Sequence, residues 1–370
     1  MIKMAVVEQI SSKQAIELEN KYGAHNYHPL PVVLSRGEGV YVYDVEGNKY
    51  YDFLSAYSAV NQGHCHPKII NALKEQAENL TLTSRAFYND KLGPYEKYIT
   101  EYFGYDKVLP MNTGAEAVET AIKISRKWGY EKKGIPTNQA KIIVCQNNFH
   151  GRTVTIISAS NDITATENFG PFTPGIISIP YNDIEALENS LQDENIAAFL
   201  VEPIQGEAGV YVPNDDFIEK AYHLCKEHNV LFVADEVQTG IARTGKLLAI
   251  DYSNIKPDIL ILGKALSGGV LPVSAVLADD EVMEVITPGS HGSTFGGNPL
   301  ASAVAIAALE IVAEENLADN AYKLGVLFRK SMKELIGTSN IVKLVRGKGL
   351  LNAIVINDSE DSSTAWDICV

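Results

Sequence analysis

The sequence predicts an α/β protein with a mostly parallel central sheet flanked by helices, and with smaller N- and C-terminal α+β parts. Between about residue 105 and residue 278, short β-branched runs alternate with amphipathic stretches, which is the rhythm of strand–helix–strand units. The 370 residues are 46% apolar and 21% charged, as in a globular chain of about two domains of ~150 residues each. This composition excludes a disordered, collagen-like or disulfide-scaffold protein.

The N-terminal part is expected to be small. Residues 8–20 have the composition of a polar helix. Residues Val32–Phe53 alternate around Gly37, Gly39 and Gly47, which predicts a small antiparallel meander.

The central part should contain the main sheet. Its helices include Asp216–His228, where Phe217, Leu224 and Cys225 recur at helical spacing. The apolar runs that we expect to form strands are Lys141–Cys145, Ala197–Val201, Val230–Ala234, Asp258–Leu262 and Pro272–Ala278.

Beyond the central part, residues 299–336 are rich in helix formers, and Ile341–Ile356 returns to glycine-punctuated strand. We therefore predict an N-terminal segment over 1–57, a large α/β domain over 58–295 and a small C-terminal domain over 296–370. The smaller parts flank the large domain along the chain.

The charge balance and the cysteines restrict the partners and the location. Acidic residues outnumber basic ones by 46 to 31, and the longest basic run is the pair Lys132-Lys133, which argues against nucleic acid. The four cysteines are widely spaced, as in a reducing compartment. The apolar stretch Ala301–Ala313 is too short to span a membrane, and the N-terminus turns polar by Glu8. We expect a cytoplasmic protein with no membrane partner.

Three of the expected strands are followed by residues that can carry chemistry. Asp235 follows one strand, Lys264 follows another, and Glu202 and Glu207 follow a third. Because ligands of open α/β sheets bind at the carboxyl ends of the strands, these side chains should meet at one edge.

Lys264 and Asp235 each have a functional and a structural interpretation. A lysine just past a buried strand loses hydration, which lowers its pKa and favours Schiff-base chemistry. Otherwise it is a solvated loop lysine, although the turn residues Gly263 and Ser267–Gly269 would crowd its amine. Asp235 suits a protonated ring nitrogen of a cofactor, or simply caps the next turn.

Two glycine-containing segments could bind a phosphate. Asn112–Ala117 follows an apolar run and opens a helix, so its free amides would form an anion site, or an ordinary helix start. His291–Asn298 is the second segment, and its alternative is a plain surface connection. Neither matches the nucleotide-binding loops.

Two further segments contain residues that could bind a cofactor, a carboxylate or a metal. Phe149 could lie on a flat cofactor and Arg152 could hold a carboxylate, or the two are a core ring and a surface cation. The segment Gly63–Pro67 contains His64 and His66, but no third ligand cluster is near in sequence, so we predict no metal site.

Taken together, these motifs resemble the class-III, pyridoxal-phosphate-dependent aminotransferases over nearly the whole chain. The resemblance implies fold type I of the pyridoxal-phosphate enzymes. The first of the matching strings carries Tyr27 and is typical of members that act on ornithine, whereas the last three are shared with related ω-aminotransferases. The strings are Tyr22–Pro31, Ser58–His64, Val201–Glu207, Ala234–Gly240 and Gly263–Gly268.

The resemblance implies a role for each candidate residue around the cofactor, pyridoxal 5'-phosphate. Lys264 would form the Schiff base and move the proton, while Asp235 would pair with the pyridine nitrogen. The remaining cofactor contacts implied are Gln238 to the phenolic oxygen, Phe149 and Val237 on the ring faces, and Gly114, Ala115, Ser293 and Thr294 at the phosphate.

Thr294 is similar to the threonine that reaches the phosphate of the other subunit, so the resemblance also implies a homodimer. For the substrate, Tyr27 and Arg152 would grip the α-amino acid end. Tyr57 would line the pocket, with Glu202 and Glu207 beside it. No nucleic acid or membrane is implied, only a small amino acid and a 2-oxo acid.

The implied reaction transfers the δ-amino group of L-ornithine to 2-oxoglutarate, giving L-glutamate 5-semialdehyde and L-glutamate, within arginine and proline metabolism. A carboxylate held at Arg152 leaves the far amine at Lys264. In the family, the counterpart of Glu207 masks an arginine near the C-terminus, which is freed for the 2-oxo acid. The printed sequence stops at Val370 before any counterpart of that arginine, so we expect a truncated chain. We expect a helix from about Ser363, and His150 stands where animal members carry Trp.

Alternatives remain open at this point. One is another ω-aminotransferase, acting on acetylornithine or 4-aminobutyrate, and the Tyr27 string counts against it. A second is an aminomutase, which needs no 2-oxo acid. A third is a non-catalytic binding protein on the same fold, which the set of Lys264, Asp235 and Gln238 opposes.

Overall fold

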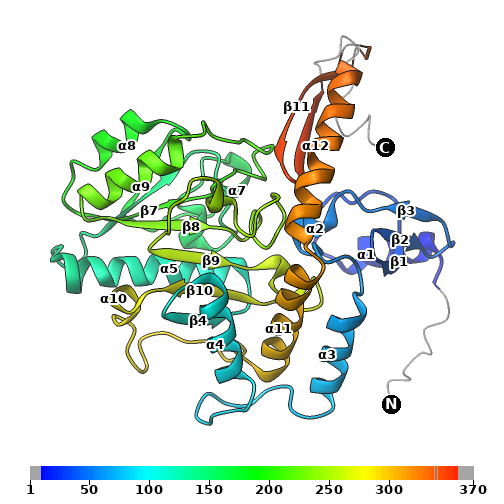
Figure 1. The fold of residues 1–370 in the computed structure, drawn as a ribbon, viewed down its shortest axis with the longest axis horizontal. Helices are drawn as coiled ribbons and strands as arrows, with labels where there is room; N and C mark the ends of the chain where they lie inside the picture. The colour runs from blue at the N-terminus through cyan, green and yellow to red at the C-terminus, as the bar shows by residue number, and fades with distance from the viewer. Residues whose placement is uncertain (1–9, 337, 340, 357–370) are drawn as a thin grey trace.

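The computed structural model describes residues 10–336, 338–339 and 341–356, so the helix expected from Ser363 lies outside the described residues. In the described chain the largest sheet has seven strands in the order β4-β10-β9-β8-β7-β5-β6. Strand β10 runs antiparallel to both β4 and β9, and the pairs from β9 through β6 are parallel. Helices cover both faces of this sheet (Figure 1). The predicted α/β class is thereby confirmed.

The bounds of the elements follow the sequence closely. The strands are β1 (Leu34–Glu38), β2 (Tyr41–Asp44), β3 (Lys49–Tyr51), β4 (Lys107–Met111), β5 (Lys141–Cys145), β6 (Ile176–Ile179), β7 (Ile196–Val201), β8 (Leu231–Asp235), β9 (Ile259–Leu262), β10 (Ser274–Ala278), β11 (Val342–Lys348) and β12 (Leu351–Ile356). The helices of seven or more residues are α1 (Ser12–Tyr22), α3 (Pro67–Ala77), α4 (Leu92–Phe103), α5 (Gly114–Trp128), α8 (Ile184–Ser190), α9 (Phe217–Glu227), α11 (Pro299–Glu314) and α12 (Leu317–Ile336). The shorter ones are α2 (Ser55–Ser58), η1 (Gly129–Lys133), α6 (Val154–Ile157), α7 (Ile163–Thr166), η2 (Ala249–Tyr252), η3 (Lys264–Ser267) and α10 (Asp280–Met283).

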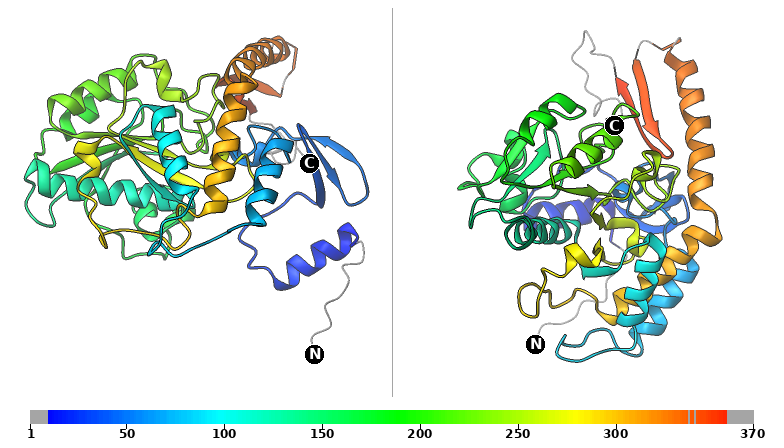
Figure 2. Two further views of the ribbon diagram at one scale, coloured as in Figure 1. Left: turned by 60° about the horizontal axis from the view of Figure 1, so that its bottom comes forward. Right: turned by 60° about the vertical axis from the view of Figure 1, so that its left-hand side comes forward.

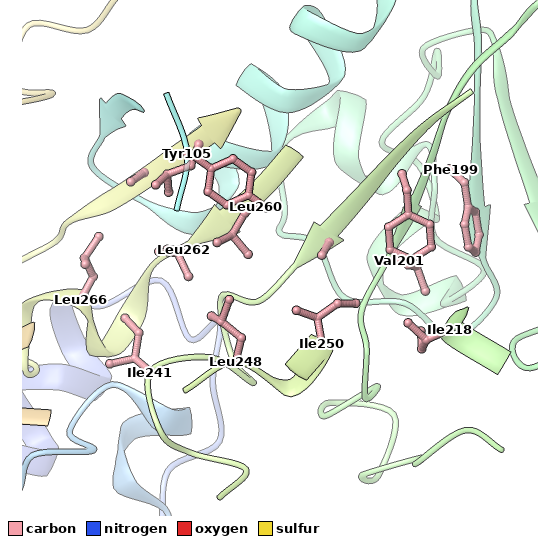
Figure 3. Packing of buried hydrophobic residues seen from close by; sticks show 14 of the residues in the cluster. Tyr105, Phe199, Val201, Ile218, Ile241, Leu248, Ile250, Leu260, Leu262 and Leu266 are labelled. Atoms are coloured by element: carbon pink, nitrogen blue, oxygen red, sulfur yellow. The ribbon is translucent and has the colours of Figure 1, made fainter. Parts of the chain in front are cut away.

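The central strands are buried on both faces, which explains why their sequences are continuously apolar rather than alternating. In β8, Phe232 and Ala234 belong to one hydrophobic cluster, while Leu231 and Val233 belong to another on the opposite face. Helices α4, α9 and α11 pack on the first face and α5 on the second. Figure 3 shows part of the first cluster, with Phe199 and Val201 of β7 on one side and Leu260 and Leu262 of β9 on the other.

The parts outside this sheet are smaller. Strands β1, β2 and β3 form the expected antiparallel meander, and α1, which has no buried residue, stands apart from the main body (Figure 2). At the other end of the described chain, β11 and β12 form an antiparallel hairpin beside α12 (Figures 1 and 2). Among the described residues, every helix is too short or too polar to cross a lipid bilayer.

Candidate functional site

A pocket opens at the carboxyl ends of the central strands, as expected for an open α/β sheet. It is lined by residues from five separate segments of the chain, which the sheet brings together. The lining residues are Gly114, Ala115, Phe149, His150, Gly151, Glu202, Asp235, Val237, Gln238, Thr239 and Lys264.

Lys264 is the first residue of η3 and follows strand β9 after the single residue Gly263; its φ of 44° is in the left-handed region. Burial lowers the pKa of Lys264, while the nearby carboxylates of Glu207, Asp235 and Glu202 act in the opposite direction. The net effect increases the fraction of neutral, nucleophilic amine at a given pH.

Asp235 ends strand β8 and is 4% exposed. Its Oδ1 accepts the backbone N–H of Val237 at 3.0 Å, and its Oδ2 accepts Nδ1–H of His150 at 2.7 Å. Burial by itself would lower the pKa of His150, but the hydrogen bond and charge of Asp235 outweigh it and raise that pKa. The pair therefore holds an oriented carboxylate at the floor of the pocket.

A second acid, Glu202, lies beside this pair at the end of β7 and is 6% exposed. Its Oε2 accepts the backbone N–H of Phe149 at 3.0 Å, which ties β7 to the loop after β5. Burial raises the pKa of Glu202 to about 8; the charge of Asp235 adds to this, and that of His150 opposes it. Glu202 is therefore mostly protonated at neutral pH.

Gln238 lines the pocket, and Glu207 is its hydrogen-bond partner. Gln238 Nε2 donates to Glu207 Oε1 at 2.9 Å, and Gly206 leaves room for the amide, since a Cβ there would lie 1.6 Å from Gln238 Oε1. That Oε1 is buried and has no hydrogen-bond partner in the described part of the chain.

The start of α5 faces the same pocket. Thr113 and Glu116 form a capping box, in which the Thr113 hydroxyl accepts Glu116 N–H at 3.2 Å and Glu116 Oε2 accepts Thr113 N–H at 2.9 Å. The next two amides, those of Gly114 and Ala115, begin the helix and have no carbonyl four residues back within it. Two such donors at the positive end of the helix dipole suit a phosphate.

The residues of this pocket fit pyridoxal 5'-phosphate. The amine of Lys264, the carboxylate of Asp235, the ring of Phe149 and the anion site at Gly114 and Ala115 line one hollow. Each of these groups matches a part of the cofactor: an amine for its aldehyde, an acid for its ring nitrogen and free amides for its phosphate.

Ser293 and Thr294 lie elsewhere. They line a different, open hollow with Ser84, Arg85 and Gly292. The side chain of Asn112 connects the two regions, because its Nδ2 donates to Ser293 Oγ at 2.8 Å.

The three remaining substrate candidates are not in the pocket that the described residues form. Tyr27 is 77% exposed and Tyr57 49% exposed. The Arg152 side chain is 59% exposed, 3.7 Å from Asp162 and stacked over the Phe149 ring at 5.3 Å. Of these three residues, only Arg152 has a described contact with a pocket residue, the ring of Phe149.

The histidines considered as metal ligands have other partners. His64 Nε2 lies 2.7 Å from Asp52 Oδ2, and His66 Nε2 lies 3.0 Å from Glu315 Oε1. His150, by contrast, received no role from sequence reasoning, although the structure places it on Asp235. The signal that could have found it is a titratable residue at the end of a buried strand, next to Phe149.

The chain is similar to a known family and to named relatives. Residues 22–370 match the family described as aminotransferase class-III. The chain is 64% identical over 352 residues to a mitochondrial ornithine aminotransferase of Drosophila melanogaster, covering 95% of this chain and 80% of that protein. It is 61% identical over 360 residues to the mitochondrial ornithine aminotransferase of Rattus norvegicus, covering 97% and 81%.

Solved structures give the same fold. The ornithine aminotransferase of Toxoplasma gondii ME49 matches with a TM-score of 0.93 at 53% identity, over 94% of this chain and 83% of that one. An acetylornithine aminotransferase of Elizabethkingia anophelis matches with a TM-score of 0.89 at 65% identity, over 97% and 88%.

Proposed function

This chain belongs to the class-III aminotransferases, and we propose that it transfers the δ-amino group of L-ornithine to 2-oxoglutarate with pyridoxal 5'-phosphate as cofactor. The observation that supports this most directly is the single pocket in which a buried lysine of lowered pKa, a buried aspartate and a helix-start anion site meet. The relatives named ornithine aminotransferase, about 60% identical over most of their length, agree with it.

Each residue of the pocket has a separate proposed role. Gly114 and Ala115 would hold the phosphate, Phe149 and Val237 would contact the ring, and Gln238 would donate to its phenolic oxygen. Asp235, oriented by His150, keeps the ring nitrogen protonated, and the bound cofactor then supplies the electron sink. Lys264 Nζ removes the proton from the substrate carbon that bears the δ-amine.

The position of Arg152, which would bind the substrate carboxylate, determines the orientation of the substrate. Arg152 binds the α-carboxylate bidentately, and Tyr27 and Tyr57 surround the α-amino acid end of the substrate. The distal amine is therefore the one that reaches Lys264. The carboxylate of Glu207 favours a substrate with a cationic amine. Glu202, protonated at neutral pH, contributes an uncharged side chain to the pocket.

We also propose that two copies complete the site, with Ser293 and Thr294 of one reaching the cofactor phosphate of the other. Their separation from the Lys264 pocket supports a shared arrangement. Large apolar side chains that a monomer would leave in water support it further; they include Tyr51, Phe53, Leu54, Phe87, Tyr88 and Phe295, and Tyr88 is fully exposed. Sedimentation at micromolar concentration should give the mass of a dimer.

N-Acetylornithine is the second candidate substrate, because the chain is 65% identical to the acetylornithine aminotransferase named above. The two substrates differ in the charge of the α-nitrogen. A hydroxyl at Tyr27 can accept from an ammonium group, and this favours ornithine.

Half-reaction kinetics tests the proposal. The holoenzyme is mixed with ornithine, N-acetylornithine, lysine or 4-aminobutyrate without a 2-oxo acid, and the change in cofactor absorbance is followed. We expect ornithine to react fastest by a wide margin. A faster reaction with N-acetylornithine would reassign the substrate, and an absence of cofactor absorbance would refute the aminotransferase activity.

We further propose a cytoplasmic location and a role in arginine and proline metabolism. Three cysteines in the described residues are unpaired, and two of them are buried, as in a reducing compartment. Since relatives from fly and rat are named mitochondrial, cell fractionation is the deciding measurement.

A further inference from the structure

A short segment next to the site has an unusual backbone. Ser55, Ala56, Tyr57 and Ser58, the residues of α2, have φ values of 54°, 45°, 57° and 75°, all in the left-handed region. None of the four is glycine, and L-residues avoid this conformation because their Cβ crowds the following carbonyl oxygen. Strain of this kind persists only where the surroundings hold the backbone in place, and it gathers at functional sites.

Asp52 holds the entrance of this turn. Its Oδ1 accepts the backbone N–H groups of Leu54 at 2.9 Å and Ser55 at 2.8 Å. Its Oδ2 lies 2.7 Å from Nε2 of His64, so the carboxylate is itself fixed. These bonds determine where the left-handed turn begins.

Arg243 holds the turn from the other side. Its Nη2 donates to Ser55 Oγ at 2.8 Å, and its Nε donates to Asn61 Oδ1 at 2.9 Å. Asn61 Nδ2 in turn donates to the carbonyl of Ile241 at 2.7 Å. Burial lowers the pKa of Arg243 to about 10, with the charge of Asp52 opposing, so the guanidinium stays charged at neutral pH. The loop after Gln238 is thereby linked to both ends of the turn.

The exit of the turn packs against the segment that follows Lys264. Gly269 has φ +78°, and a Cβ on it would lie 2.3 Å from Val60 Cγ1 and 3.3 Å from the carbonyl oxygen of Ala59. This close approach places the turn in a fixed relation to the lysine.

We propose that Arg243 is a positioning residue for substrate recognition: together with Asp52 it holds the Ser55–Ser58 turn left-handed and so sets the position of Tyr57 at the α-amino acid end of the substrate. The inference rests on the role proposed for Tyr57. Arg243 itself does not touch the substrate, and it acts through Ser55.

A purely structural role for Arg243 must be separated from this one. Arg243 also contacts the β11–β12 hairpin, because its Nη1 donates to the Leu350 carbonyl at 3.4 Å and its own carbonyl accepts Leu350 N–H at 3.0 Å. Arg329 is a matched control, because it is also half-buried and donates to the neighbouring Gly349 carbonyl at 2.9 Å, yet its described hydrogen bonds are to the hairpin and not to the turn.

The test uses the holoenzymes of Arg243→Gln, Arg329→Gln, Tyr57→Ala and the double variant Arg243→Gln/Tyr57→Ala. The substrates are ornithine and 1,4-diaminobutane, which is ornithine without its carboxylate. We expect Arg243→Gln to raise KM for ornithine about 10-fold with kcat within about 3-fold, and to leave KM for the diamine unchanged. Arg329→Gln should change neither KM. Ser55→Ala, which removes only the hydrogen bond to the turn, should raise KM for ornithine about 3-fold, so the test does not depend on the folding of Arg243→Gln.

Further measurements distinguish a failure of the inference about Arg243 from a failure of the role proposed for Tyr57. In the double variant, KM should equal that of Tyr57→Ala, because both changes act through one side chain. Independent, multiplicative effects would overturn the inference. If Tyr57→Ala leaves KM for ornithine unchanged, the role of Tyr57 itself is refuted. Amide hydrogen exchange at residues 54–60 reports on the turn without turnover, and it should quicken in Arg243→Gln but not in Arg329→Gln; equal exchange in the two would also overturn the inference.

Discussion

The carboxyl edge of the main sheet and the N-terminal segment, which we propose to share one site, are held in place in opposite ways. At the edge, Asp235 and Glu202 are 4% and 6% exposed, and each is hydrogen-bonded to a neighbouring loop. In the N-terminal segment, Tyr27 and Tyr57 are 77% and 49% exposed, and the latter sits on a turn held by a few polar side chains. The two carboxyl groups at the edge are thus fixed in buried surroundings, whereas the position of Tyr57 depends on long-range polar contacts.

The largest effect should come from the edge. Lys264→Ala removes the amine that moves the proton, so turnover of ornithine should fall by at least about 10³-fold, since general acid–base catalysis contributes 10²–10⁴-fold. The melting temperature should stay close to that of the original protein. Lys264→Arg is the control, because it keeps the charge but cannot supply a neutral amine; recovery of activity in that variant would contradict the role.

The next effect is at Asp235. An amide cannot keep the ring nitrogen protonated, so Asp235→Asn should lower kcat about 10²-fold with little change in ornithine KM. Glu236→Gln is the adjacent control: Glu236 is 1% exposed but bonded to Thr239 and the Ile250 amide. It should reduce stability and leave kcat of the folded fraction unchanged. Equal losses of kcat in the two variants would argue against a specific role for Asp235.

For the N-terminal segment we expect an effect on binding alone. Tyr27→Phe removes one hydroxyl from a proposed contact with a charged group, and such a bond contributes about 1.5–3 kcal/mol, or at least about a 10-fold rise in ornithine KM. Tyr22→Phe is the matched control, because Tyr22 is 74% exposed. Steady-state kinetics decides, and a change in kcat with constant KM would place Tyr27 outside substrate binding.

At the sheet edge we also expect an effect of pH on the stability of the folded protein, through Glu202. The pKa of Glu202 is raised to about 8 by burial, above its ordinary value of 4.5, so the folded state holds the proton longer than the unfolded state does. The stability from this group is present at low pH and is lost as pH rises toward 8. Glu202→Gln should therefore lose less melting temperature between about pH 6 and about pH 9 than the original apoprotein does. Parallel curves would show that Glu202 does not titrate in this range.

The smallest effect tests the turn. At Ala56, where φ is 45°, glycine relieves a left-handed strain of roughly 1 kcal/mol, which offsets its larger unfolded-state entropy. Ala56→Gly should therefore leave the free energy of unfolding unchanged or raise it slightly. In helix α1, Ala15→Gly should lower it by about 0.5–1 kcal/mol. Denaturant unfolding compares them, and equal losses would contradict a strained turn.

The same contrast explains what could be predicted from the sequence. Strand β5 was predicted at its observed bounds and β8 within one residue, because buried parallel strands are continuous apolar runs that end in functional residues. The antiparallel direction of β10 was not predicted, since a strand buried on both faces has the same composition in either direction.

For the site, the meeting of Asp235, Glu202 and Lys264 followed from the rule that parallel strands end at one edge. The bond between His150 and Asp235 joins residues 85 positions apart, and the left-handed turn consists of ordinary residues held by Arg243, 188 positions away from Ser55. Local patterns contain no information about either.

The capping box of α5 has a consequence for how the protein responds to dilution. Glu116 Oε2 already accepts the amides of Asn112 at 3.0 Å and Thr113 at 2.9 Å, so this helix start offers a phosphate only the next two amides, those of Gly114 and Ala115. In the proposed dimer the hydroxyls of Ser293 and Thr294 of a second copy supply further donors. Retention of the cofactor then obeys mass action in the protein itself. If the proposed dimer shares its phosphate sites in this way, a dilute solution should retain less cofactor than a concentrated one.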